Sequence, residues 1–429
     1  MDEIAAERTA QPVQDHHEHS GVLRFITAGS VDDGKSTLIG RLLHDSRHVL
    51  EDQLAAVTRA SRSRGMAEVD LSLLTDGLEA EREQGITIDV AYRYFATARR
   101  KFIIADTPGH EQYTRNMATG ASTAHAAIIL ADATRGLVEQ GRRHLYIAHL
   151  LGVRDLIVAV NKMDLVGFDR AVFESVREAF EDFAEGAGAS AARIHYIPLS
   201  ALRGDMVVER GTRLNWYGGP TLLEHLETLE PQAAASAFPL RFPVQLVQRT
   251  PERGRAYLGR IAAGSVYAGQ RVVVLPSGVE TTIASVHRGL EAQSGATAGD
   301  AVSLTLATQV DVARGDIIAD ADHAPRLVNT FDATLVWLVN ALRPGATYLL
   351  KHGTRTVKAK VSHVSHVVDV NTLHRCPPSG PIGANSIFRA ELTALQPLAL
   401  DAYEENRSTG AFILIDETTN QTIAAGMVS

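Results

Sequence analysis

Apolar runs and amphipathic segments alternate along the first half of the chain. Runs of strand length stand at residues 22–28, 102–105, 126–131, 156–160 and 195–199. Segments with apolar residues at helical spacing lie between them, at 139–151 and 171–184. Alternation of this kind predicts a mostly parallel sheet with helices on both faces. We expect this α/β domain to span residues 22–230.

The pattern changes after residues 231–238, a stretch with Pro231 and an alanine run that we interpret as a linker. Beyond it, short β-rich runs are separated by turns that carry Gly or Asp, which favours small antiparallel barrels. We expect one barrel at 239–324 and a second at 325–429. Residues 1–21 are acidic and rich in histidine, so we expect a disordered tail and no signal peptide.

The first predicted strand leads into Gly29-Ser-Val-Asp-Asp-Gly34-Lys35-Ser36, which fits the phosphate-binding pattern G-x-x-x-x-G-K-[ST]. The glycines allow backbone N–H groups to surround a polyphosphate at a helix N-terminus. We expect Lys35 to reach the β- and γ-phosphates and the Ser36 hydroxyl to bind Mg²⁺. The predicted phosphate site consists of Gly29, Ser30, Val31, Asp32, Asp33, Gly34, Lys35, Ser36 and Thr37.

A second motif, Asn161-Lys162-Met163-Asp164, follows the predicted strand 156–160. The Asp164 carboxylate can accept hydrogen bonds from N1–H and the 2-amino group of guanine, and adenine offers neither. We expect the Lys162 stem to lie along one face of the base and Asn161 to join this loop to the phosphate loop. Backbone N–H groups after the next strand can meet guanine O6, and they belong to Ser200, Ala201 and Leu202. The sequence therefore predicts GTP rather than ATP.

Two further segments are typical of nucleotide-sensing switches. Asp106-Thr107-Pro108-Gly109-His110 follows strand 102–105, which places Asp106 to hold Mg²⁺ through a water and the Gly109 N–H to sense the γ-phosphate. His110 stands where GTPases place the residue that orients the attacking water. Thr87 is the candidate second hydroxyl on Mg²⁺ when the γ-phosphate is present. The predicted catalytic residues are Lys35, Thr87, Gly109 and His110, and the predicted metal ligands are Ser36, Thr87 and Asp106.

Asp32 and Asp33 place negative charge beside a triphosphate. Such charge is unfavourable unless a cation or a partner offsets it. Two interpretations remain open: Asp32 helps to hold a monovalent cation, or both carboxylates point to solvent.

Composition narrows the classes of partner. The chain of 429 residues has a net charge of −8, from 42 basic and 50 acidic residues, and no strong basic patch, so we expect no nucleic-acid partner. Its one cysteine, Cys376, excludes an internal disulfide and fits a reducing cytoplasm. No apolar run is long enough to span a membrane, so we expect no membrane partner.

Together these motifs resemble those of translation-factor-like GTPases of the elongation factor Tu type, from about Val22 onward. Within that superfamily, Asp33, Ser36 and the segment Asn215-Trp-Tyr-Gly-Gly-Pro-Thr-Leu-Leu-Glu224 resemble the large (GTPase) subunits of sulfate adenylyltransferases. Translation factors usually carry His at the position of Asp33. The resemblance also implies that Val31 and Ile86 form an apolar gate beside His110.

The resemblance implies a P-loop GTPase domain followed by two small β-barrels, and a regulatory subunit of a heteromeric sulfate adenylyltransferase. A small catalytic subunit would make adenosine 5′-phosphosulfate and pyrophosphate from ATP and sulfate, and this chain would couple GTP hydrolysis to that step. The alternative is a translation elongation factor-type GTPase that carries aminoacyl-tRNA. The chain has no second P-loop, so we expect no fused adenylylsulfate kinase domain.

Overall fold

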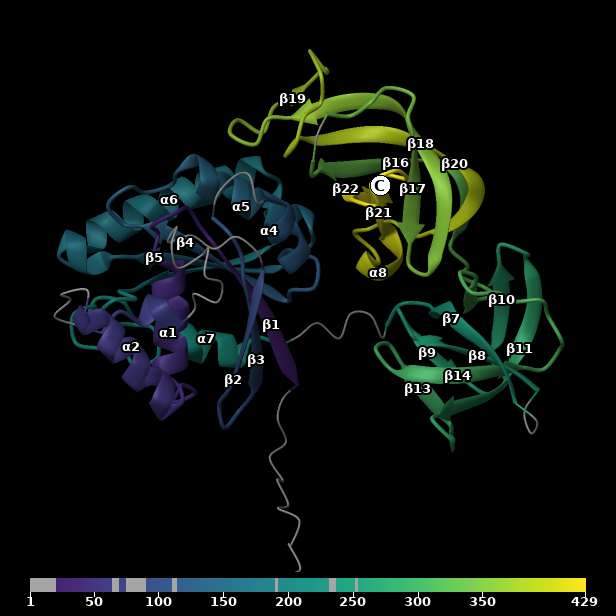
Figure 1. Cartoon of the computed structure of the whole chain (residues 1–429), viewed down its shortest axis with the longest axis horizontal. Coiled ribbons are helices and arrows are strands. Elements are labelled where there is room, and N and C mark those ends of the chain that lie inside the picture. Colours follow the sequence, from purple (N-terminus) through teal and green to yellow (C-terminus); the bar gives the residue numbers. More distant parts are fainter. Residues whose placement is uncertain are drawn as a thin grey trace, which may run out of the picture.

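The computed structural model describes residues 21–63, 69–74, 90–109, 114–189, 192–230, 237–250, 254–339 and 341–429. Figure 1 shows an α/β domain on the left and two β-domains on the right, with the C-terminal one above the other. Thus the predicted fold class, an α/β P-loop domain followed by two small β-barrels, is confirmed.

A six-stranded sheet forms the centre of the α/β domain, in the order β2-β3-β1-β4-β5-β6. Its strands are β1 (Val22–Ala28), β2 (Ala91–Ala96), β3 (Lys101–Asp106), β4 (Ala126–Asp132), β5 (Asp155–Asn161) and β6 (Arg193–Pro198). All neighbouring strands are parallel except β2, which runs antiparallel to β3 at the edge. Every residue of β4 and β5 is buried, as expected of strands covered on both faces.

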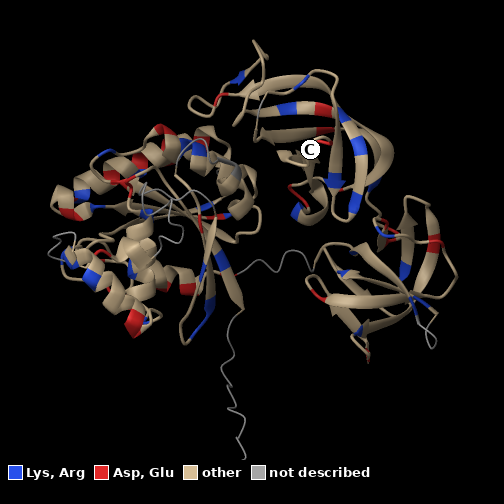
Figure 2. Cartoon of the chain, viewed as in Figure 1, with Lys and Arg blue, Asp and Glu red and all other residues tan. Residues whose placement is uncertain are grey.

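Helices cover both faces of this sheet (Figure 1). They are α1 (Lys35–Asp45), α2 (Glu51–Ser63), α4 (Thr114–Ala121), α5 (Glu139–Leu150), α6 (Arg170–Gly186) and α7 (Leu222–Thr228). The expected helices at 139–151 and 171–184 are α5 and α6. Arg170, Glu174, Arg177 and Glu181 pair along α6, so this surface alternates in charge, as Figure 2 also shows.

The segment 215–220, just before the last helix of this domain, is tied to the body of the domain by two side chains. The Trp216 indole N–H donates to the Phe168 carbonyl oxygen at 2.9 Å, and the Tyr217 hydroxyl donates to that of Tyr196, also at 2.9 Å. Helix α7 then begins with a capping box, in which the Thr221 and Glu224 side chains each accept a backbone N–H of the other. The Trp-Tyr segment therefore has a structural role at the end of the α/β domain.

The first barrel is a seven-stranded antiparallel sheet in the order β10-β15-β7-β8-β14-β11-β12, closed by pairing of β10 with β11. Its strands are β7 (Arg241–Thr250), β8 (Gly254–Arg260), β10 (Arg271–Leu275), β11 (Val279–Arg288), β12 (Glu291–Gln293), β14 (Ala301–Leu306) and β15 (Ile317–Asp320). Two short strands, β9 (Ser265–Tyr267) and β13 (Gly295–Thr297), pair separately. Phe242, Tyr257 and Ile318 are buried in its core.

The C-terminal barrel is a second seven-stranded sheet, in the order β17-β21-β22-β16-β20-β18-β19, closed by pairing of β17 with β18. Its strands are β16 (Arg326–Trp337), β17 (Thr347–His352), β18 (Arg355–Val368), β19 (Arg375–Cys376), β20 (Ile387–Leu400), β21 (Ala411–Ile415) and β22 (Thr422–Val428). A short helix, α8 (Arg407–Gly410), lies between β20 and β21. Trp337 and Phe388 are buried in the core of the C-terminal barrel.

The C-terminal barrel contacts both other domains. Tyr403 joins the apolar core of the α/β domain, and its hydroxyl donates to the Leu151 carbonyl oxygen at 2.7 Å. Arg241 of the first barrel forms two hydrogen bonds of 2.9 Å with Asp401, and both side chains are buried. The predicted domain limits stay predictions, because residues 1–20 and 231–236 lie outside the described ranges.

Among the described residues, no helix has the length and apolar character needed to cross a membrane.

Candidate functional site

Four loops that carry the predicted site residues follow the ends of parallel strands at one edge of the sheet. Residues 29–34 follow β1, 107–109 follow β3, 162–164 follow β5 and 200–202 follow β6. Because carboxyl ends of parallel strands meet at the same sheet edge, the topology brings these motifs together. This edge is where open α/β sheets bind ligands.

The phosphate loop is held by Lys35, the first residue of α1. The Lys35 ammonium donates to the carbonyl oxygens of Gly29 at 3.0 Å and Ser30 at 2.7 Å. Burial lowers the pKa of Lys35, and the nearby Asp106 carboxylate opposes that shift. Gly34 has a φ of 95°, and a Cβ there would lie 2.5 Å from the Asn161 amide nitrogen. Glycine is therefore required at this position both for its conformation and for space.

The two acidic residues of the phosphate loop, Asp32 and Asp33, differ in burial. Asp33 is only 2% exposed, and its Oδ2 accepts the Ser30 backbone N–H at 2.5 Å. Burial raises the pKa of this carboxyl. Asp32 is exposed, with a left-handed φ of 69°. The interpretation that both carboxylates point to solvent is therefore wrong for Asp33, because its side chain folds back under its own loop. A cation at Asp32 stays a prediction.

Asn161 connects three of the loops. Its side-chain Nδ2 donates to the Asp33 carbonyl oxygen at 2.8 Å, and its Oδ1 accepts the Ala201 backbone N–H at 2.9 Å. The side chain is buried, so these bonds are sheltered from water. The loop predicted to bind the base and the loop predicted to bind the phosphates are thereby held at a fixed separation.

Asp164 is oriented by a hydroxyl from the neighbouring loop. The Ser200 Oγ donates to Asp164 Oδ1 at 2.6 Å, and Arg203 Nε lies 3.9 Å from Oδ2. Ala201 is buried, whereas the Leu202 side chain is 49% exposed. The sequence prediction used only the backbone of residues 200–202 and missed the Ser200 hydroxyl. An oriented carboxylate at this position suits recognition of two adjacent N–H groups.

Lys162 and Arg41 have partners that the sequence prediction did not include. Lys162 Nζ lies 2.8 Å from Asp132 Oδ2, at the end of β4. Asp132 directly follows the buried apolar run 126–131 and lies at the same sheet edge, so the sequence pattern could have indicated it as a site residue. Arg41, on α1, donates through Nε to the Ala201 carbonyl oxygen at 3.1 Å and through Nη2 to that of Leu202.

The Asp106–Gly109 segment lies directly against the phosphate loop. Thr27 Oγ1 donates to Asp106 Oδ1 at 3.2 Å, and Thr107 Oγ1 donates to the Thr27 carbonyl oxygen at 2.7 Å. A Cβ on Gly109 would lie 2.6 Å from the backbone carbonyl oxygen of Gly29, so this close approach requires glycine. Ser36, with a hydroxyl, and Asp106, with a buried carboxylate, offer oxygen ligands of the kind that Mg²⁺ prefers.

The predicted residues Thr87 and His110 lie outside the described residues, as does Ile86 of the predicted apolar gate. Val31 lies in the described phosphate loop and is half-buried.

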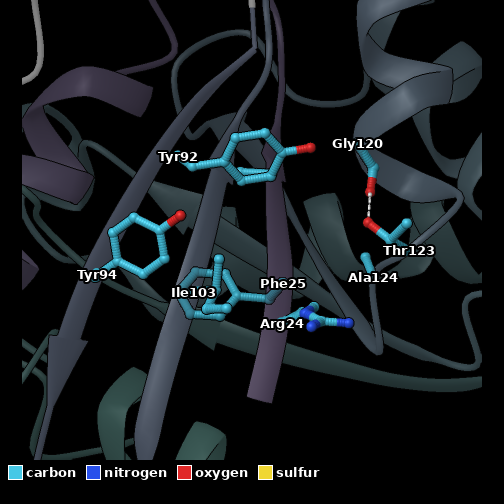
Figure 3. A pocket seen from close by; sticks show the side chains of 9 residues that line it. Arg24, Phe25, Tyr92, Tyr94, Ile103, Gly120, Thr123 and Ala124 are labelled. Atoms are coloured by element: carbon cyan, nitrogen blue, oxygen red, sulfur yellow. Dashed lines mark hydrogen bonds between the residues drawn. The ribbon is translucent and has the colours of Figure 1, made fainter. Parts of the chain in front are cut away.

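A pocket of about 360 Å³ lies beside helix α4, on the face of β1, β2 and β3 (Figure 3). Tyr92 and Tyr94 line it and are 45% and 67% exposed. The other lining residues are Arg24, Phe25, Ile103, Ala105, Gly120, Thr123 and Ala124. None of the predicted nucleotide-site residues lines this pocket, so it is separate from the site at the sheet edge.

Two family models match the chain. The elongation factor Tu GTP binding domain matches residues 20–232, and the GTP-eEF1A C-terminal domain-like model matches residues 330–429. A crystal structure of sup35 complexed with GDP covers 98% of the chain and 97% of its own chain, at 23% identity and a TM-score of 0.42.

Curated relatives match nearly the whole chain. Sulfate adenylyltransferase subunit 1 of Shewanella oneidensis is 49% identical over 99% of this chain and 89% of that protein. Sulfate adenylyltransferase subunit 1 of Citrobacter koseri is 50% identical over 96% of this chain and 87% of that protein. The bifunctional enzyme CysN/CysC of Mycobacterium tuberculosis is 51% identical over 95% of this chain and 67% of that protein.

Proposed function

The chain belongs to the sulfate adenylyltransferase subunit 1 family of elongation factor Tu-type GTPases, and we propose that it is the GTP-hydrolysing regulatory subunit of a heteromeric sulfate adenylyltransferase. The observation that carries this proposal is identity near one half along almost the whole chain, barrels included. The geometry supports it through Asn161, which joins a guanine-type loop to a phosphate loop. The family assignment favours this function over a carrier of aminoacyl-tRNA.

Each predicted site residue has its own role in the proposed hydrolysis of GTP. Asp164 would accept N1–H and the 2-amino group of guanine, and Lys35 would balance charge on the β- and γ-phosphates. Ser36, Asp106 and Thr87 would hold Mg²⁺, which neutralises phosphate charge when bound. His110 would orient a water whose oxygen forms a bond to the γ-phosphorus. The bond between that phosphorus and the β–γ bridging oxygen breaks, which yields GDP and inorganic phosphate.

Coupling requires a partner. Formation of adenosine 5′-phosphosulfate and pyrophosphate from ATP and sulfate is uphill, because a phosphate–sulfate anhydride lies above the α–β anhydride of ATP. The P-loop at 29–36 is accompanied by the guanine motif at 161–164, so we expect this site to take GTP and not ATP. We therefore assign adenylyl transfer to a small catalytic subunit and the supply of free energy to this chain. A single exposed cysteine, Cys376, suits the reducing cytoplasm in which we place the complex.

The test compares the chain alone with the chain and its small subunit. The chain alone should make no adenosine 5′-phosphosulfate from ATP and sulfate. With the small subunit, GTP and Mg²⁺ should raise the product above the equilibrium yield reached with ATP only, and a non-hydrolysable GTP analogue should abolish that excess. GTP-dependent retention of aminoacyl-tRNA on a filter, without association with an adenylyltransferase, would instead support the translation-factor alternative.

A further inference from the structure

The Asp33 carboxylate is built into the phosphate loop. Its Oδ2 accepts the Ser30 N–H at 2.5 Å, and the Asp33 N–H points back to the Ser30 carbonyl oxygen at 3.4 Å. A Cβ on Gly29 would lie 3.2 Å from the same carboxylate oxygen. The side chain therefore fills the space beneath the first residues of the loop and closes it on itself.

This position makes Asp33 a connection between the two halves of the site. Its backbone carbonyl oxygen accepts from the Asn161 side chain, and its carboxylate holds Ser30, whose carbonyl oxygen accepts from Lys35. Loss of the carboxylate would free the Ser30 N–H and loosen the loop, although Lys35 and Asn161 would keep their own bonds. The hydrogen bond at Ser30 is thus a restraint on loop shape.

The hydrogen bond of Asp33 supports a loop that can bind phosphates, whereas its negative charge weakens phosphate binding. The carboxylate is buried in the same short loop that would receive the negatively charged phosphates. Burial raises the pKa of this carboxyl, whereas the hydrogen bond from Ser30 and the charges of Lys35 and Arg135 favour its ionised form. The Lys35 ammonium itself points to the carbonyl oxygens of Gly29 and Ser30. In a partly desolvated site, a like charge several ångströms from a phosphate lowers affinity by roughly tenfold.

We propose that Asp33 sets the lifetime of bound nucleotide: its hydrogen bond to Ser30 preserves the loop, and its negative charge speeds the release of GDP. This inference rests on the proposed binding of guanine nucleotides. The Asp33 carboxylate acts through the backbone of Ser30, so it is a positioning residue. Fast release would suit a chain that passes through the GDP state in every coupled turnover.

The experiment separates the charge from the hydrogen bond. Asp33→Asn keeps a carbonyl acceptor for Ser30 and removes the charge, and Asp33→Ser is a second neutral acceptor. Asp33→Ala removes both properties. Glu178→Gln, at an exposed position of α6, removes one negative charge away from the site. Release of a fluorescent GDP analogue, chased with excess GDP in full-length protein, is measured for each variant alongside its thermal unfolding.

Asp33→Asn should release GDP about tenfold more slowly than wild type, and Glu178→Gln should match wild type within about twofold. Asp33→Ala should bind GDP more weakly than Asp33→Asn, because its loop lacks the Ser30 restraint. Release from folded Asp33→Asn or Asp33→Ser at the wild-type rate or faster would overturn the inference. Absence of guanine-nucleotide binding by wild type would contradict the proposed function itself, which is a different result.

Discussion

Arg407 Nη2 lies 3.3 Å from the carbonyl oxygen of Ser122, in the turn that follows helix α4. The same side chain also donates to the carbonyl oxygens of Ala121 at 3.4 Å and Gly152 at 3.2 Å. Carbonyl oxygens at a helix C-terminus lack partners within the helix, and a cation there is favourable. The C-terminal barrel thus caps α4, the helix that follows the segment containing His110.

Removing this cap should weaken the docking of the C-terminal barrel. Arg407→Ala should lower the free energy of unfolding by about 1–3 kcal/mol, because the carbonyl oxygens of Ala121, Ser122 and Gly152 lose a charged donor. Arg389→Ala, which breaks a surface ion pair with Asp332 in the same barrel, should change it by less than about 1 kcal/mol. Denaturant unfolding of both variants checks this, and equal effects would contradict the docking role.

Asp164→Asn should change the preferred base. Xanthine presents a carbonyl where guanine has its 2-amino group, so an Asn amide suits it. We expect GTP affinity to fall by about a hundredfold or more relative to xanthosine triphosphate. Competition binding measures the ratio, with Asp169→Asn as the control, because Asn also caps the start of α6 well. An unchanged preference for GTP in Asp164→Asn would remove Asp164 from base recognition.

His110→Ala should lower single-turnover GTP hydrolysis by orders of magnitude and leave GTP affinity nearly unchanged, because His110 is expected to position water rather than to bind ground-state GTP. His323→Ala, at an exposed site of the first barrel, is the matched control. Parallel losses of binding and turnover in His110→Ala would indicate a structural role instead.

The two hydroxyls predicted to bind Mg²⁺ should respond differently to the nucleotide. Ser36→Ala should raise the Mg²⁺ concentration needed for binding of both GDP and GTP. Thr87→Ala should raise it mainly for GTP, since this contact is expected only with a γ-phosphate. Mg²⁺ titrations with each nucleotide distinguish the two variants. If Thr87→Ala impairs the GDP state as strongly, Thr87 does not report the γ-phosphate.

His225 should make stability depend on pH. Burial, and then the neighbouring His195, lowers the pKa of His225 to about 4, and the two rings lie 4.1 Å apart. The unfolded chain binds more protons than the folded one below the ordinary histidine pKa of 6.5, so stability falls as pH drops from 6.5 toward 4. Between these two pKa values, protonation of His225 should lower the free energy of unfolding by up to about 1.4 kcal/mol for each pH unit that the pH falls. His225→Phe should show a shallower loss in thermal unfolding at pH 7, 6 and 5, and identical slopes would contradict it.

Local patterns predicted the strands and the loops at their ends, because burial of β1, β4 and β5 leaves long apolar runs. They also predicted that Asn161 would lie near the phosphate loop, since both follow strands of one parallel sheet. They did not predict the burial of Asp33, which depends on how its own loop closes. Contacts of Arg41 and Arg407 join residues far apart in sequence, and a single arginine carries no periodic signal of its partner.

Asp401 and Arg407 lie in one short stretch between β20 and β21, and each is bound to a different neighbouring domain. Asp401 binds Arg241 of the first barrel, whereas Arg407 binds the α/β domain. Residues 401–407 of the C-terminal barrel therefore help to set the distance between the first barrel and the α/β domain. These two contacts lie only six residues apart, so one short stretch of the C-terminal barrel holds both other domains in place.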